Sequence, residues 1–356
     1  MVVVPTRCLS FHAAYRCRHA GECCRAGWDV DVEPHIVEAV EAGRIAVPRA
    51  TPVPFTRSPD GSGIVPSRTA SGDCGFHQDC RCSLQSSGGG AMLPSACRHF
   101  PRVYLRDPRG DLLTLSHFCP TAASLLLDEQ PVRVVEASEP LALQEPIEGL
   151  DARSALPPLV RPGMLADLDG FAAWEEAVIA QAVESATADA ALATIAAATD
   201  VVRRWSPSQG PMRAAVEAAF ASRLDPGPSA GLSPAFALVS ELTGPHPLMN
   251  VAADFVDRWR HAHASAEPAT HRIIGRHLAA SAFANWIAYR GQGLRSIVAW
   301  LRGCHDVFRV QAARLLPAGR SLDTATTLEA IRMTDYIMVH TVDSLAFGRQ
   351  AVTFER

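Results

Sequence analysis

Cys17-Arg18-His19-Ala20-Gly21-Glu22-Cys23-Cys24 is the stretch around which the rest of this sequence is organised. It opens a run of cysteines that continues as far as residue 119. Eight of the ten cysteines belong to this third of the chain, and only Cys8 and Cys304 lie outside it. The eight are Cys17, Cys23, Cys24, Cys74, Cys80, Cys82, Cys97 and Cys119. Such clustering requires a single chemical explanation.

Disulfide bonds are a weak explanation for this cluster. A chain of 356 residues can bury enough apolar surface to fold without cross-links. Met1 to Val4 is a short apolar run that Pro5 interrupts, so it does not resemble a secretory leader. No stretch approaches the roughly 18 uninterrupted apolar residues of a membrane span. We therefore expect a cytoplasmic protein, and in that compartment clustered thiols usually bind metal or take part in catalysis.

The charge of the chain argues against nucleic-acid and membrane partners. The formal net charge is -4, no run of five basic residues occurs, and the sequence contains no lysine. Phosphate-rich surfaces attract basic patches, which this sequence lacks. We expect neither a nucleic acid nor a membrane as a partner.

The sulfur chemistry leaves several kinds of metal site open. Four thiolates can close a tetrahedral zinc site or hold an iron–sulfur cluster, and eight could also serve two metals. The spacing matches neither a zinc finger nor a ferredoxin. Cys80 is the least certain ligand of the eight. Four histidines beside the cysteines could complete a mixed site, namely His19, His77, His99 and His117. Buried cysteines can also be plain small apolar residues.

The fold class predicted from these patterns is mainly α. Residues 1–128 are expected to form a cysteine-rich, largely irregular metal domain with one or two small β-hairpins. Residues 129–163 carry many prolines and read as a linker, and 164–356 as an all-helical domain. Its expected helices are 164–186, 188–205, 211–223, 233–243, 248–264, 269–290, 294–316 and 322–346.

Local patterns in the first domain predict several short elements. Trp28 to Glu33 alternates apolar and acidic residues, which indicates a strand, and Pro34 opens a helix that stops at Gly43. A turn at 59–61 indicates a hairpin, and 102–115 reads as a second one. Residues 74–90 are too rich in Gly, Ser and Cys for regular elements. Cys119-Pro120 opens a helix that reaches 127.

Several ordered pieces of the first 130 residues resemble a known family. These are Cys17…Cys23-Cys24-Arg25-Ala26-Gly27-Trp28, Gly72-Asp73-Cys74-Gly75-Phe76, Cys82-Ser83-Leu84-Gln85, Cys97-Arg98-His99-Phe100-Pro101-Arg102 and Ser116-His117-Phe118-Cys119-Pro120-Thr121-Ala122-Ala123. Together they look like the flagellin lysine-N-methylases, part of a wider bacterial cysteine-cluster family described as zinc- or iron-chelating. Ala20 stands where the wider family usually has a further cysteine, and Cys80 is extra, so Cys8 or Cys80 could substitute as a ligand.

The resemblance implies an enzyme with an iron–sulfur cluster, 4Fe-4S by preference and zinc as the alternative. It would transfer a methyl group from S-adenosylmethionine to the Nε atom of a lysine in a protein substrate, with flagellin as one candidate. Because the amine must be neutral to attack, Asp29 and Asp31 are candidate catalytic groups. Arg98 and Arg102 are candidate cofactor-binding residues, since guanidinium groups bind carboxylates.

Two other functions fit the same residues. The cysteine domain could hold zinc or iron for structure, storage or delivery while the helices bind a partner. Alternatively, the cluster could carry out redox chemistry on another substrate. In the helical half, Arg332, Tyr336 and His340 recur every four residues, so one helix face could carry polar groups toward the metal domain.

Overall fold

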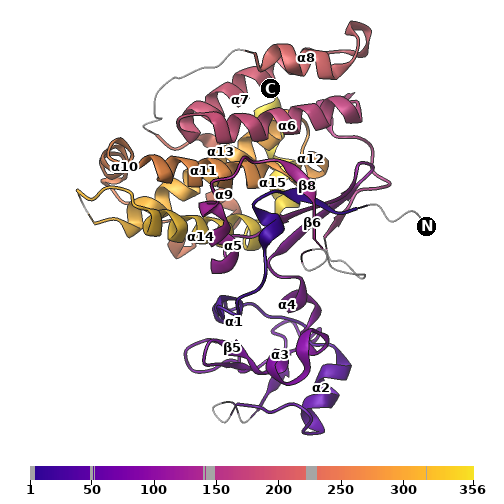
Figure 1. Cartoon of the computed structure of the whole chain (residues 1–356), viewed down its shortest axis with the longest axis vertical. Coiled ribbons are helices and arrows are strands. Elements are labelled where there is room, and N and C mark those ends of the chain that lie inside the picture. Colours follow the sequence, from indigo (N-terminus) through magenta and orange to yellow (C-terminus); the bar gives the residue numbers. More distant parts are fainter. Residues whose placement is uncertain are drawn as a thin grey trace.

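The computed structural model describes residues 5–48, 51, 53–138, 141, 149–221, 231–317 and 319–356. Two parts are visible in Figure 1. The larger part, which we call the body, contains a β-sheet and the long helices. The smaller part, which we call the cysteine lobe, comprises the described residues between 17 and 100. The chain enters the lobe after the first strand and leaves it before the central hairpin, so the lobe is an insertion between sheet strands.

A five-stranded mixed sheet has the order β8-β1-β7-β6-β9. Its central hairpin pairs Arg102 with Leu115 at one end and Asp107 with Gly110 at the other, which confirms the hairpin predicted from the sequence. β1 runs parallel to β7, and β9 runs parallel to β6. The strands are β1 (Arg7–Leu9), β6 (Arg102–Asp107), β7 (Gly110–Leu115), β8 (Val134–Glu136) and β9 (Leu150–Asp151).

Helices form most of the body, as the sequence predicts. The α-helices of the body are α5 (Pro120–Ser124), α6 (Leu168–Glu184), α7 (Ala188–Val202), α8 (Met212–Ala219), α9 (Pro234–Thr243), α10 (Phe255–Ala264), α11 (Pro268–Ala282), α12 (Ile287–Arg290), α13 (Leu294–Leu315), α14 (Thr324–His340) and α15 (Ser344–Gln350). Short 3-10 turns occupy His12–Ala14, Gly89–Met92, Leu125–Leu127, Pro207–Gln209, Pro247–Met249 and Ala351–Glu355. In the part of the chain that the structure describes, no helix is both long and apolar enough to cross a membrane.

Four of the predicted helices differ from the observed ones. The helix expected at 248–264 begins only at Phe255, after a 3-10 turn at Pro247–Met249. The helix expected from 164 begins only at Leu168, because Met164–Leu165 is strand β11, which pairs with β10 (Leu159–Arg161). Asp167 caps this helix by accepting a hydrogen bond from the Gly170 N–H at 2.6 Å. The helix expected at 269–290 is split into α11 and α12, with Ala284 between them in a left-handed conformation. The helix expected at 322–346 is likewise split, into α14 and α15.

The main apolar core lies between the sheet and the helices. α13 is buried along nearly all its length and packs against α7, α9, α10, α11 and α14. Leu105 and Leu112 of the sheet belong to the same buried cluster as Trp174 and Leu301 of the helices. The core therefore extends across the expected boundaries at 128 and 163, although the division into domains stays a prediction.

The cysteine lobe consists of short elements. They are α1 (Glu22–Arg25), α2 (Pro34–Glu41), β2 (Phe55–Arg57), β3 (Ile64–Pro66), β4 (His77–Gln78), β5 (Arg81–Cys82), α3 (Ser83–Gly88) and α4 (Ser95–His99). The helix after residue 33 and the hairpin around 59–61 are confirmed. The strand expected at 28–33 does not form, because this extended segment has no ladder of paired strand residues. Residues 74–90 were expected to be irregular but contain β4, β5 and α3.

Candidate functional site

Five cysteines line one small cavity of about 30 Å³ in the cysteine lobe. Two of them come from α1, one from the bridge that pairs Arg68 with Cys74, one from β5 and one from α4. The five are Cys23, Cys24, Cys74, Cys82 and Cys97. They come from segments up to 74 residues apart in sequence, so the fold of the lobe gathers most of the predicted metal ligands at one place.

Cys24 lies at the centre of this group. Hydrogen-bonding contacts from Cys23, Cys74 and Cys82 raise the pKa of the Cys24 thiol well above its usual range. The contact with Cys24 in turn lowers the pKa of Cys82 to about 7, and it lowers the pKa of Cys23 and Cys74. Burial raises the pKa of Cys97. A thiol that accepts a hydrogen bond from Cys24 is therefore more readily ionised, and the thiolate is the form that binds soft metals.

The spacing of these sulfur atoms bears on the kind of metal. Within the described ranges, no three cysteines have their sulfur atoms all within 4.8 Å of one another. A tetrahedral zinc ion with Zn–S bonds of about 2.3 Å places its sulfur ligands about 3.8 Å apart. As a set, the five sulfurs are spread more widely than a single zinc ion requires.

The remaining predicted ligands lie elsewhere. Cys17 is exposed, and Cys119 is buried with its sulfur 3.9 Å from the Tyr15 hydroxyl. Cys80 is exposed at a left-handed position with φ of 60° and does not line the small cavity. The structure therefore does not bring these three cysteines to the cavity that holds the other five. Cys8 is buried, and its burial raises the pKa of its thiol to about 12.

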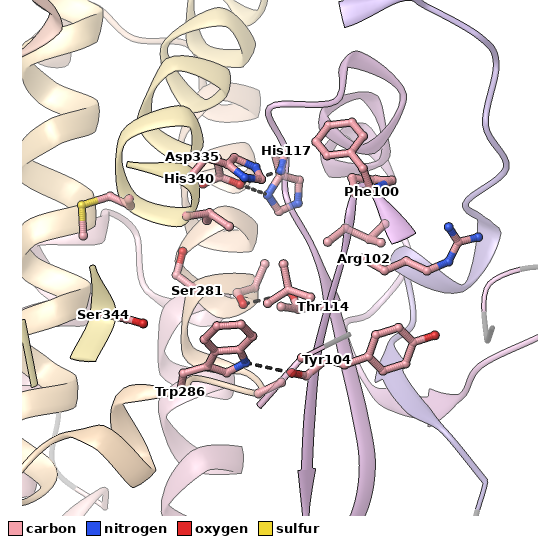
Figure 2. A pocket seen from close by; sticks show the side chains of 18 of the residues that line it. Phe100, Arg102, Tyr104, Thr114, His117, Ser281, Trp286, Asp335, His340 and Ser344 are labelled. Atoms are coloured by element: carbon pink, nitrogen blue, oxygen red, sulfur yellow. Dashed lines mark hydrogen bonds and ion pairs between the residues drawn. The ribbon is translucent and has the colours of Figure 1, made fainter. Parts of the chain in front are cut away.

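A second, larger cavity of about 350 Å³ adjoins the small one. Cys23, Trp28, Val30 and Cys97 line both. From there the larger cavity runs between the sheet and helices α11 and α14, and Figure 2 shows His117, Asp335 and His340 at one end and Trp286 at the other. Most of its lining is apolar, and its volume falls in the range of ligand sites in proteins, about 300 to 1,000 Å³.

Three buried polar side chains meet at one end of this cavity. Asp335 of α14 lies 3.0 Å from the His117 Nδ1 atom and 2.7 Å from the His277 Nε2 atom. The His117 backbone N–H also donates to Asp335, at 2.6 Å. His12 completes the group, with its Nε2 atom 3.1 Å from the His117 Nε2 atom. Although Asp335 is buried, its imidazole neighbours hold its pKa below the usual range. The carboxylate is therefore ionised at neutral pH.

His340 connects α14 with the sheet and the cysteine lobe. Its Nε2 atom lies 2.7 Å from the Ser116 hydroxyl oxygen, and its ring centre lies 4.5 Å from that of Trp28. Burial lowers the pKa of His340 to about 4, although nearby Asp335 opposes the shift. One turn earlier, Tyr336 stacks on Trp28 at 6.4 Å.

Arg332 lies one further turn toward the start of α14. It donates to Glu22 of α1 at 2.9 Å. This places Arg332, Tyr336 and His340 on a helix face that meets the lobe.

The predicted catalytic and cofactor-binding residues occupy different surroundings. Asp29 and Asp31 do not line either cavity, and Asp29 instead pairs with Arg68 at 3.6 Å. Arg102 does line the larger cavity, and its Nε atom donates to the Leu141 carbonyl at 2.6 Å. Arg98 lines neither cavity. Of these four residues only Arg102 lines a cavity, and its guanidinium group donates to the Leu141 and Arg98 carbonyls. The catalytic and cofactor-binding roles stay predictions.

Comparison with protein-family models, with curated proteins and with solved structures gives no match to this chain.

The sequence does not predict the group formed by His12, His277 and Asp335, and it offers His117 only as a ligand that could complete a mixed site with the cysteines. His117 and His277 are 160 residues apart, and no short motif links either of them to Asp335. The only local signal is a polar residue on an otherwise buried helix face, as for His277 on α11 and Asp335 on α14. That signal marks a buried polar residue without naming its partner.

Proposed function

We propose that this protein is an iron–sulfur methyltransferase that moves a methyl group from S-adenosylmethionine to the Nε atom of a lysine in a protein substrate. The observation that carries the proposal is that the two cavities share four lining residues, namely Cys23, Trp28, Val30 and Cys97. This arrangement provides for a cluster held by thiolates directly beside a space large enough for a small molecule. The proposed reaction itself is inferred from the resemblance of the ordered cysteine pieces to lysine-N-methylases.

The donor set suits the proposed cluster. Thiolates are the usual ligands of iron–sulfur clusters, and five converge on one cavity with a wider spread than one zinc ion requires. Cys23, Cys24, Cys74, Cys82 and Cys97 are the candidate ligands, and Cys24 would be among those that hold the cluster. When bound, a cluster with one iron not held by cysteine would be able to chelate the amino acid part of the methyl donor at that iron.

The larger cavity would bring the reacting groups together away from water. Its apolar lining, which includes Trp28, Phe100 and Trp286, disfavours the charged form of a lysine and so lowers its pKa. The amine would then enter neutral, having released its proton to solvent. In the transfer, the nitrogen lone pair forms a bond to the methyl carbon while the sulfonium C–S bond breaks. The sulfur keeps the electron pair, and the methylated nitrogen loses its second proton to water.

Metal analysis of protein purified without oxygen tests the cluster. We expect brown protein that contains iron and acid-labile sulfide. Cys24→Ser should lose both, because Cys24 contacts three other sulfurs. Cys80→Ser is the matched control: Cys80 is in the same lobe but lines neither cavity, so this variant should keep both. Colourless wild-type protein containing zinc would refute the cluster.

Mass spectrometry of co-expressed protein substrates, flagellin among them, tests the transfer. We expect added methyl groups on lysine with the wild type. Val339→Trp should abolish them, because Val339 lines the larger cavity with 39% of its surface exposed and the indole would fill the space. Val352→Trp, at a position 40% exposed and outside the cavity, should leave methylation intact. An intact cluster without methylation would favour redox chemistry on another substrate.

A structural zinc site is the second candidate, and one observation favours it. The small cavity, at about 30 Å³, exceeds the roughly 10–15 Å³ that one water molecule requires and so has room for a single ion. In that case the cysteine lobe would be a binding module without catalysis. Stoichiometric zinc that persists after purification without oxygen, with no sulfide, is the result that would support it.

A further inference from the structure

The group of His117, His277 and Asp335 lies apart from the cysteine cavity and has the composition of a metal site. These residues come from the turn between β7 and α5, from α11 and from α14. Their side chains are at most 6% exposed. Across the described ranges, they form the only set of three histidine, cysteine or carboxylate ligand atoms that all lie within 4.8 Å of one another.

The distances in the group suit the coordination of one ion. Zinc and similar ions bind imidazole nitrogen at about 2.0 to 2.1 Å and carboxylate oxygen at about 2.0 to 2.2 Å. Two such ligands lie about 2.9 Å apart at the right angle of an octahedral ion and about 3.4 Å apart at the tetrahedral angle of zinc. The two imidazole–carboxylate separations are 3.0 Å and 2.7 Å, each to a different oxygen of Asp335. Only small shifts would be needed to admit an ion.

Asp335 carries a carboxylate into the interior of the protein. In the described structure its ion-pair partners are the two histidines, with no arginine among them. Burial of a carboxylate is costly unless it is paired or coordinates a metal. A divalent cation between the three side chains would provide such a partner.

The surroundings of the group resemble the support that metal ligands usually have. The His117 ring contacts His12 through its second nitrogen at 3.1 Å, which fixes the orientation of the ring. The His117 backbone N–H donates to Asp335 and fixes the carboxylate. Among the residues that the structure describes, the buried His12 Nδ1 atom has no hydrogen-bond partner, so the contact with His117 is the side-chain hydrogen bond that His12 makes there.

The group also faces a space in which a ligand of the ion could sit. His117 and Asp335 line the larger cavity, at the end that Figure 2 shows. Metal sites that take part in reactions keep a coordination position open, whereas structural sites are closed by protein ligands. Two histidines and one carboxylate with an open side form the arrangement found for ferrous iron and for catalytic zinc.

We propose that His117, His277 and Asp335 bind one divalent transition-metal ion at the end of the larger cavity, independently of the cysteines. His12 positions His117 and does not bind the ion. This site holds whether or not the cysteine cavity carries an iron–sulfur cluster. The alternative is that the group is only a hydrogen-bonded network joining α11 and α14 to the turn after β7.

Titration of chelator-treated protein with Co²⁺ distinguishes these possibilities. Cobalt bound to thiolates gives intense sulfur-to-metal charge-transfer absorption, whereas cobalt bound to imidazole and carboxylate gives only weak visible bands. In the Cys24→Ser variant, which disables the cysteine cavity, we expect one remaining equivalent of Co²⁺ with the weak bands alone. No remaining Co²⁺ in that variant would overturn the proposal, and this result would leave the cluster assignment untouched.

His277→Gln in the same background identifies the ligand. The glutamine amide can still donate to Asp335 but is a poor metal ligand, so the hydrogen-bonded network is preserved while the ion is lost. We expect loss of the remaining equivalent, with unchanged helix content in circular dichroism. His263→Gln, a matched change on α10 outside the group, should bind Co²⁺ like its parent. Undiminished binding by His277→Gln would show a network without a metal.

His12→Phe provides a second test if His277→Gln fails to fold. It keeps all three ligands and removes only the contact with the His117 ring. Loss of such outer contacts typically weakens metal affinity about 10- to 100-fold. We expect a weakening of that size in competition against a chelator of known affinity. Unchanged affinity would contradict the positioning role of His12 and with it the placement of the ion at His117.

Discussion

The cysteine lobe and the body obtain their structure in different ways. The buried apolar cluster of the lobe consists of seven residues, namely Val32, Ile36, Ala39, Val40, Ile45, Phe76 and Leu84. Its longest helix, α2, has eight residues. The body has one extended core and a central helix, α13, of 22 residues. A core as small as that of the lobe stabilises little on its own, so the five cysteines and the metal proposed for them are expected to contribute most of its stability.

The largest expected effect is therefore local unfolding of the lobe when its metal is removed. Binding of structural zinc contributes an apparent free energy of about 10 to 16 kcal/mol in zinc-finger peptides. Chelation under reducing conditions, or Cys24→Ser, should leave the lobe without that contribution. Hydrogen exchange measured by mass spectrometry should then be fast in residues 17–100 and unchanged in α6, α7 and α13. If the backbone amides of the lobe exchange equally slowly with and without metal, the lobe does not depend on the metal for its stability, and in this respect it does not differ from the body.

The next largest effect is expected from a cavity in the body. Leu301 is fully buried on α13 within the main core. Leu301→Ala should lower the free energy of unfolding of the body by about 2 to 5 kcal/mol. Urea denaturation followed by far-ultraviolet circular dichroism measures this loss. Metal content should stay at the wild-type value, because the core of the lobe is separate. Loss of metal together with body stability would show that the two parts fold as one unit.

This difference also explains how much of the fold the sequence could predict. Long periodic helices such as α7 and α13, and the hairpin from Arg102 to Leu115, follow from local patterns and are confirmed. The alternation at 28–33 wrongly predicts a strand, although Trp28 and Val30, two residues apart, both line the cavities. It could not indicate that no strand would pair with the segment, because pairing is decided by distant residues.

The two candidate sites also differ in how far the sequence predicts them. Clustered cysteines are visible in the sequence because cysteine is rare and its metal chemistry is distinctive, yet the sequence could not separate the five that converge from Cys17, Cys80 and Cys119. The meeting of His277 with Asp335 depends on the packing of α11 against α14. No spacing rule links two residues on separate helices, so that group could be found only in three dimensions.

A moderate loss of stability is expected when the pH is lowered, because His340 lies where the body contacts the cysteine lobe and takes up a proton on unfolding. Burial holds the His340 pKa at about 4, whereas in the unfolded chain it is about 6.5. Between these values the unfolded state binds the proton and the folded state does not, so stability is lost as the pH falls below 6.5. The groups that face His340 are Asp335, which opposes the shift, together with the Ser116 hydroxyl and the Trp28 ring.

His340→Gln removes this titration while retaining a group able to bond with Ser116. On moving from pH 7 to pH 5, the wild type should lose about 1 to 2 kcal/mol more than the variant, by the linkage between proton binding and folding. Urea midpoints at the two pH values measure the difference. His35→Gln, at an exposed position of α2, should behave as the wild type. If the urea midpoints of the wild type and of His340→Gln fall equally between pH 7 and pH 5, His340 has the same pKa in the folded and the unfolded state.

The smallest effect is expected from the ion pair that joins the two parts. Arg332 donates to Glu22 at 2.9 Å and to the Phe118 carbonyl at 3.1 Å, with a side chain 14% exposed. Arg332→Leu keeps the apolar stem but removes both contacts. Because the pair is only partly shielded from water, we expect a loss of about 1 kcal/mol and a several-fold faster release of the lobe's metal to a chelator.

Arg260→Leu provides the comparison, since Arg260 pairs with Asp257 on the surface of α10 with 64% of its side chain exposed. An exposed pair of this kind contributes about 0.5 kcal/mol or less, and its loss should leave metal release unchanged. The measurement thus separates contact between the parts from a general effect of removing arginine. If both variants release metal at the wild-type rate, α14 does not support the lobe, and the lobe is held by its metal and its own small core alone.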